Sequence, residues 1–144
     1  MEYTIKQISE MTGISVSALR FYDKSGLLPF VQRKKSGYRI FTELDLSSLQ
    51  LIKCLKETGM SIDDIKKFSD WVRQGDSTLQ QRYEMFVERK AAVEKQIEEL
   101  KKSLDVIEYK KNYYETALKR GSEDSMRGKD KLPHVEDFFN YSAM

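Results

Sequence analysis

The feature that most constrains this chain is a regular apolar pattern in its second half. Twelve positions follow one another at alternating spacings of four and three residues without a slip, and ten of them are apolar or aromatic. They are Leu79, Tyr83, Phe86, Lys90, Val93, Ile97, Leu100, Leu104, Ile107, Lys111, Tyr114 and Leu118. This period predicts a coiled-coil helix about 60 Å long at ~1.5 Å per residue. Such a helix needs a partner, so we expect self-association through it.

Two lysines, Lys90 and Lys111, interrupt this apolar seam. One interpretation is that they set the register or orientation of the paired helices, at some cost in stability. The other is that their aliphatic stems lie along the seam while their ammonium groups reach water at its edge.

The beginning of the chain has the pattern of two short helices joined by a tight turn. Thr4 and Gln7 have the spacing of a capping box, in which each side chain satisfies a free amide at a helix start. Gly13 suits a turn, and Ser15 can cap a second helix over residues 16–24. This arrangement predicts a helix-turn-helix.

A short hairpin and two more helices follow. A Ser-Gly turn at residues 36–37 lies within a segment, residues 30–41, whose aromatic and β-branched residues favour strands. We expect a two-stranded wing there, then helices over residues 42–58 and from residue 61 to near Gly75. The predicted fold is mainly α, with an N-terminal winged helix-turn-helix domain followed by a long dimerising coiled-coil helix. The domain boundaries expected are 1–75, 76–120 for that helix, and 121–144 for a flexible link and short apolar tail.

Charge is distributed unevenly along a chain whose net charge is only +2. Residues 15–42 contain six basic side chains and one acidic side chain, Asp23. Such a local positive patch is typical of a phosphate-binding surface. The second helix presents a row that fits a recognition helix, and Arg33 adds charge in the wing. The row consists of Val16, Ser17, Arg20 and Lys24. Arg20 can pair with the two acceptors of guanine or hold a phosphate, and both roles stay open.

Several classes of protein and site are disfavoured by the sequence. It has no apolar run near the ~20 residues of a membrane span and no leader pattern, so we expect a cytoplasmic protein without membrane contact. One cysteine, Cys54, and one distant histidine, His134, are too few for a Cys/His metal cage, and no cofactor is predicted. No catalytic motif is present, so we do not expect an enzyme.

Several sequence blocks resemble the N-terminal domain of MerR-family regulators over residues 4–60. They are the run Ile5 to Gly13, then Leu19-Arg20-Phe21-Tyr22-Asp23-Lys24, Gly26-Leu27-Leu28-Pro29 and Gly37-Tyr38-Arg39, in the family's order and spacing. The resemblance implies that Arg20, Tyr22, Tyr38 and Arg39 contact DNA, with Thr4 and Lys24 as helpers. Phe21 and Phe41 stand where many members have tyrosine, so contacts through those hydroxyls are not expected.

The resemblance also implies a mechanism. A homodimer joined by an antiparallel coiled coil would bind near-palindromic, double-stranded promoter DNA and act on RNA polymerase indirectly, by bending and untwisting the spacer between the promoter elements. Distorting a duplex costs a few kcal/mol, which a signal-dependent change between two dimer geometries can supply. The competing class is a non-catalytic coiled-coil interaction protein, which would need no basic helix-turn-helix or wing.

The inducing signal is open between two candidates. Cys54 lies in a stretch that resembles cysteine-bearing members that respond to aldehydes or thiol-reactive electrophiles in a stress response, and nearby lysines favour a thiolate. The alternative for Cys54 is a small buried side chain on a core helix. The second candidate signal is a small aromatic or cationic effector held by aromatic residues of the long helix and tail. These residues, which could instead simply pack the tail, are Tyr109, Tyr113, Tyr114, Phe138, Phe139 and Tyr141.

Overall fold

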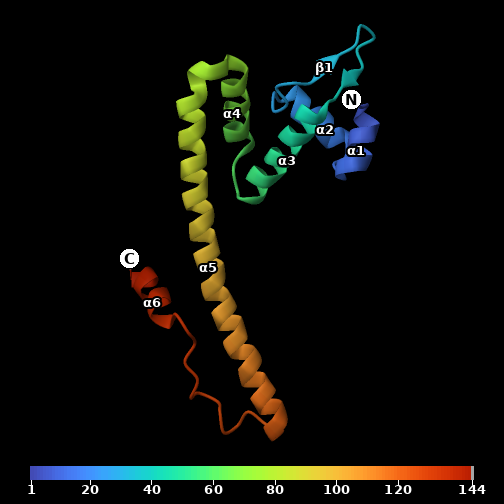
Figure 1. The fold of residues 1–144 in the computed structure, drawn as a ribbon. Helices are drawn as coiled ribbons and strands as arrows, with labels where there is room; N and C mark the ends of the chain where they lie inside the picture. Colours follow the sequence, from blue (N-terminus) through green and yellow to red (C-terminus); the bar gives the residue numbers. More distant parts are fainter. Residues whose placement is uncertain (144) are drawn as a thin grey trace. The chain divides into compact units, whose positions relative to one another are not determined.

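The computed structural model describes the backbone of residues 1–143 and the side chains of residues 1–139. Figure 1 shows short helices and a small hairpin in the N-terminal half, followed by one long helix. The elements are α1 (Ile5–Thr12), α2 (Val16–Lys24), β1 (Gln32–Arg33), β2 (Arg39–Ile40), α3 (Glu43–Glu57), α4 (Ile62–Gln74), the 3-10 turn η1 (Gly75–Thr78), α5 (Leu79–Arg120) and α6 (Val135–Ala143). The predicted mainly α fold, with a helix-turn-helix before a long helix, is confirmed. Within residues 1–143 no helix is long and apolar enough to cross a membrane.

The caps expected from the sequence fix the start of both helices of the helix-turn-helix. The amide of Gln7 donates to Thr4 Oγ1 (3.2 Å), and the amide of Thr4 donates to Gln7 Oε1 (2.8 Å). Gly13 ends α1 with φ 74°, a left-handed conformation that favours glycine. Ser15 then caps α2 by accepting from the amide of Ala18 (3.1 Å). These local bonds set the tight turn between α1 and α2.

The wing is a two-stranded antiparallel sheet in which Gln32 pairs with Ile40 and Arg33 with Arg39. Pairing is confined to two residues in each strand, so the wing is shorter than the predicted segment of residues 30–41. Its base is joined to the N-terminus by an isolated bridge between Tyr3 and Phe41. Phe41 is fully buried, so this bridge anchors the wing to the core.

The core of the N-terminal half is formed by apolar side chains from α1 to α4. Its largest fully buried apolar members are Ile8, Leu19, Leu27, Phe41, Leu49 and Ile65. Two caps position the helices that complete it: Asp45 forms a capping box with Thr42 at the start of α3, and Ser61 caps α4. Helix α4 ends at Gly75, as the sequence predicts.

The chain forms two compact units that divide within α5, residues 1–87 and residues 88 onward. The first turns of α5 therefore belong to the N-terminal unit. Met85 packs against its core, and the ring of Phe86 lies edge-on to Phe68 of α4 at 5.4 Å between centroids. The expected boundary after residue 75 marks the end of α4, while the compact unit continues about two turns into α5.

The predicted link and the tail are each joined to α5 by an ion pair. Lys110 Nζ donates to Asp130 Oδ2 (2.8 Å), and Lys102 Nζ donates to Asp137 Oδ2 (2.9 Å). One of the charged residues that suggested a flexible link over residues 121–131, Asp130, is thus an ion-pair partner of α5.

Candidate DNA-binding surface

Helix α2 exposes one face and buries the other. Leu19 is fully buried and Tyr22 is 8% exposed, so these two side chains fix the rotation of the helix against the core. Ser17, Arg20 and Lys24 are exposed, and Val16 is half-buried at the first turn. The row predicted for a recognition helix is therefore available to a partner along its length.

The wing presents a second set of polar side chains. Tyr38 is 76% exposed, and Arg33, Lys34 and Lys35 are also exposed around the turn. Arg39 is half-buried at the wing's base. Guanidinium groups and a phenolic hydroxyl are donors that suit phosphate oxygens.

An aspartate on α2 connects these two parts of the surface. Arg39 Nε donates to Asp23 Oδ2 (2.6 Å), and Arg33 lies against the same oxygen at 3.4 Å. The side chains of Asp23 and Arg39 are only 15% and 17% exposed, so water screens this pair less than an open surface pair. Asp23 thus fixes the wing arginines relative to the helix. The sequence pattern alone does not indicate this role, although Asp23 is the single acidic residue within the basic segment.

Tyr22 is placed differently from the other residues implied by the family resemblance. Its ring is buried, and its hydroxyl accepts a hydrogen bond from Lys56 Nζ of α3 (2.9 Å). The same ammonium lies 5.2 Å from the ring centroid. Tyr22 therefore joins α2 to α3. A contact between Tyr22 and DNA stays a prediction, and only the hydroxyl edge of the ring could make it.

The remaining residues implied by the resemblance divide between exposed and buried sites. Thr4 is exposed, with its hydroxyl engaged in the cap of α1. Phe21 is 52% exposed, whereas Phe41 is fully buried. A tyrosine hydroxyl at residue 41 would have to be accommodated in the core, which explains physically why phenylalanine suits this position.

A buried carboxylate lies where the wing leads into α3. Asp45 Oδ2 accepts from the amide (2.8 Å) and hydroxyl (3.3 Å) of Thr42. Burial raises the pKa of Asp45, and the negative charge of Asp23 adds to this shift, while the bonds from Thr42 oppose it. Among the described residues, Asp45 Oδ1 has no hydrogen-bond partner. The hydrogen-bonded oxygen fixes the turn that follows β2.

Cys54 lies on α3 and is exposed in the described chain. The alternative that it is a buried core side chain is therefore wrong. The core positions of this helix are Leu49, Ile52 and Leu55, which share its opposite face.

The aromatic residues proposed as a ligand pocket are not gathered into one pocket by the described side chains. Tyr113 is buried, donates to Glu123 (2.9 Å) and packs edge-on against Tyr114. Burial, followed by the bond to Glu123, raises the pKa of Tyr113. Of the five whose side chains are described, Phe138 alone lines the groove of about 490 Å³ between α5 and the tail. The side chain of Tyr141 lies outside the described residues.

Comparison with known proteins places this geometry in a family. Residues 3–70 match the model of the MerR HTH family regulatory proteins, and residues 46–108 match a second model described as MerR, DNA binding. An uncharacterized HTH-type transcriptional regulator of Haemophilus influenzae is 48% identical over 122 residues, covering 85% of this chain and 90% of that protein. The regulator YyaN of Bacillus subtilis is 38% identical over 81% of this chain and 83% of its own length.

A solved structure agrees with these sequence matches. The crystal structure of HiNmlR, a MerR family regulator lacking the sensor domain, bound to promoter DNA, is 46% identical, with a TM-score of 0.81 over 88% of this chain and all of that one. The helix-turn-helix, the wing and the long helix of this chain are thus matched in sequence and in fold together. The chain belongs to the MerR family of helix-turn-helix, DNA-binding transcription regulators.

Proposed function

We propose that this protein binds a near-palindromic promoter as a homodimer and regulates transcription by distorting the DNA between its two half-sites. The observation that carries the proposal is the joint presence of a basic helix-and-wing surface and an apolar seam on α5 that is mostly exposed in the described chain. A relative of 46% identity was crystallised bound to promoter DNA. Contact with RNA polymerase would be indirect, through the altered shape of the promoter.

The seam supports pairing of two copies in antiparallel orientation. Leu100, Ile107 and Leu118 are 70%, 64% and 82% exposed in the single chain, and covering them would remove much apolar area from water. The spacing of the twelve seam positions reads the same in both directions. Two antiparallel copies therefore bring Leu79 against Leu118 and Ile97 against Leu100, with no seam position left over.

The two seam lysines fit this arrangement as edge residues. Lys90 is bonded to Glu94, and Lys111 lies 3.4 Å from Glu108, so each ammonium has a partner on its own helix. The hydrogen bond that Lys90 donates to Glu94 raises the pKa of Lys90. These contacts favour the interpretation in which the stems cover the seam and the charged ends remain in water.

Selection of binding sites from random duplex DNA tests the proposal. We expect enrichment of a two-fold symmetric sequence that binds two chains per site. Fluorescence anisotropy at several salt concentrations should give a slope of log affinity against log salt of roughly −7, for about eight phosphate contacts in the dimer. Enrichment of no sequence, or of an asymmetric site bound by one chain, would contradict the proposal.

Replacing Asp23 by asparagine is expected to lower discrimination between promoter and random DNA. The wing arginines would lose the carboxylate that fixes them, a loss of about 1.5 kcal/mol or roughly tenfold in specific affinity. Removal of a negative charge should meanwhile strengthen nonspecific binding. Paired titrations with promoter and scrambled duplexes measure the ratio of specific to nonspecific affinity.

Glu10 offers a matched control for this substitution, because it is an exposed carboxylate on α1. The change Glu10→Gln removes the same charge and should leave the ratio of specific to nonspecific affinity close to that of the wild type. Equal ratios for the two variants would show that Asp23 contributes only charge.

Cys54 remains a proposed sensor of thiol-reactive electrophiles, and its exposure supports this role. We expect an alkylating reagent to modify Cys54 in the native protein at a rate within about tenfold of the urea-unfolded chain, since an exposed thiol needs no unfolding. Mass spectrometry of timed samples gives both rates without ambiguity, because the chain contains one cysteine. Reaction only after unfolding would exclude the role and leave a small-molecule effector as the candidate signal.

A further inference from the structure

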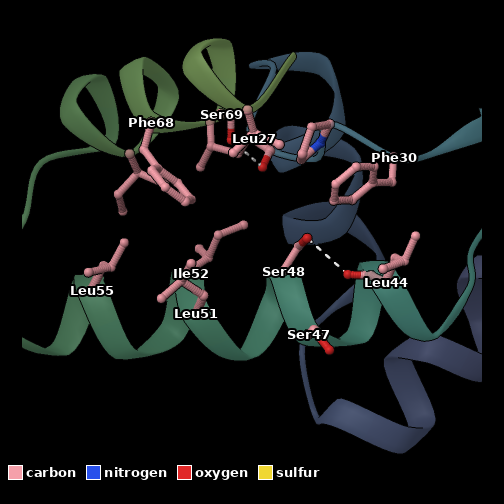
Figure 2. A pocket seen from close by; sticks show the side chains of 13 residues that line it. Leu27, Phe30, Leu44, Ser47, Ser48, Leu51, Ile52, Leu55, Phe68 and Ser69 are labelled. Atoms are coloured by element: carbon pink, nitrogen blue, oxygen red, sulfur yellow. Dashed lines mark hydrogen bonds between the residues drawn. The ribbon is translucent and has the colours of Figure 1, made fainter. Parts of the chain in front are cut away.

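An apolar hollow lies inside the N-terminal unit, between α3 and α4. It has a volume of about 240 Å³ and is closed on one side by the segment 27–30 that leads from α2 toward the wing (Figure 2). We propose that this cavity binds a small uncharged molecule, about the size of a substituted monocyclic aromatic ring. Only its regulatory consequence rests on the proposed function; the binding itself does not.

The walls of the cavity select against charge. None of its lining side chains is ionisable: ten are apolar and three are serines. Two of the serine hydroxyls donate to backbone carbonyls, Ser48 to Leu44 (2.9 Å) and Ser69 to Leu27 (2.8 Å), as Figure 2 shows. Their oxygens can still accept one hydrogen bond each. The fitting ligand is therefore mostly apolar, with at most one or two donor groups.

The size of the cavity sets the size of the ligand. Protein interiors are close-packed, and voids larger than a water molecule are few. An engineered apolar cavity of about 150 Å³ holds one benzene, so about 240 Å³ has room for a ring with a few further atoms. The floor is formed by side chains that are almost completely buried, Leu27, Ile52, Leu55 and Ile65, whereas Phe30 and Leu44 are 40% and 58% exposed. These two residues give the ligand a path from solvent.

The position of the cavity connects its contents with two parts of the regulator. Phe68 lines the cavity and also contacts Phe86 in the first turns of α5. Ser69 lines it and holds the carbonyl of Leu27, just after α2. A molecule that spreads α3 from α4 would therefore press on the start of the coiled-coil helix and on the segment between α2 and the wing.

Toluene is a suitable probe, and benzoate is its charged counterpart. We expect toluene to shift the NMR signals of the Ile52, Leu55 and Ile65 methyl groups of the full chain in a saturable manner, with nuclear Overhauser contacts from the ring. Benzoate should leave these signals unchanged, because burying a carboxylate without a partner is strongly unfavourable. These readouts contain no DNA, so failure of ligand binding is seen separately from failure of promoter binding.

A filled cavity provides the matched test. The substitution Ser48→Phe places a ring in the space and should abolish the toluene-dependent shifts, whereas Gln50→Phe on an exposed position of α3 should retain them. If Ser48→Phe does not fold, the Overhauser contacts in the wild type decide the question alone. The proposal is overturned if toluene gives no saturable shift or if benzoate binds equally well. It is also overturned if the methyl signals change with the concentration of the protein but not with that of toluene. The last result would mean that a second copy covers the cavity.

Discussion

Replacing Leu100 by glutamate is expected to convert the proposed dimer into monomers. In the antiparallel register Leu100 faces Ile97 of the second copy near the symmetry axis, so one substitution introduces two carboxylates close together in an apolar interface. Losing the burial of two leucine side chains costs about 4 kcal/mol, or roughly a thousandfold in association, before the repulsion is added. Sedimentation equilibrium at micromolar concentration measures the change.

The N-terminal unit should remain folded in this variant, because Leu100 lies beyond its last residue, Val87. Circular dichroism and the fluorescence of Trp71, which lies on α4, report on the folding of that unit. The matched control is Lys95→Glu, which introduces the same side chain at an exposed position away from the seam. A Leu100→Glu protein that sediments as a dimer would refute the seam and its register.

The second large effect is expected for the double substitution Arg20→Ala, Arg39→Ala. Each guanidinium contact with a base edge or a phosphate contributes about 1.5–3 kcal/mol, so the pair should cost about 3 kcal/mol or more, at least a hundredfold in promoter affinity. Arg20 extends from α2 and Arg39 from the base of the wing, so both parts of the candidate surface are tested together. Fluorescence anisotropy titration at constant salt gives the ratio of the promoter affinities of the wild type and the variant.

The control for this loss removes two arginines elsewhere. Arg73→Ala, Arg127→Ala changes the net charge equally, at positions on α4 and in the link that follows α5. It should bind the promoter within a few-fold of the wild type. Promoter binding by the Arg20→Ala, Arg39→Ala protein that is as tight as the wild type would contradict the assignment of the DNA-binding surface and favour the coiled-coil interaction protein.

The parts of the fold that depend on neighbouring residues could be predicted from the sequence. The capping box at Thr4, the cap at Ser15 and the end of α4 at Gly75 all involve residues within three or four positions. The apolar period of α5 is also local, because every seam position is set by counting along the chain. The helix-turn-helix and the long helix follow from these signals.

The contacts that hold the candidate surface together depend on residues far apart in sequence. Arg39 reaches Asp23 across 16 residues, and Lys56 reaches Tyr22 across 34. The sequence pattern does not indicate which arginine pairs with Asp23. It also does not indicate that the ring of Tyr22, within a DNA-binding motif, is buried in the core. The role of Asp23 therefore required the folded chain.

The continuity of α5 between Phe86 and Ile97 has a consequence for how chains of this kind can vary. Phe86 is fixed against α4, and the seam continues from it along the same helix to Ile97, three turns later. One residue inserted between them would rotate everything beyond it by about 100°, whereas a loop would absorb the same insertion. The number of residues in this stretch is therefore more strictly constrained than their identity. Natural variation should substitute side chains there while preserving the count, or change it by whole heptads.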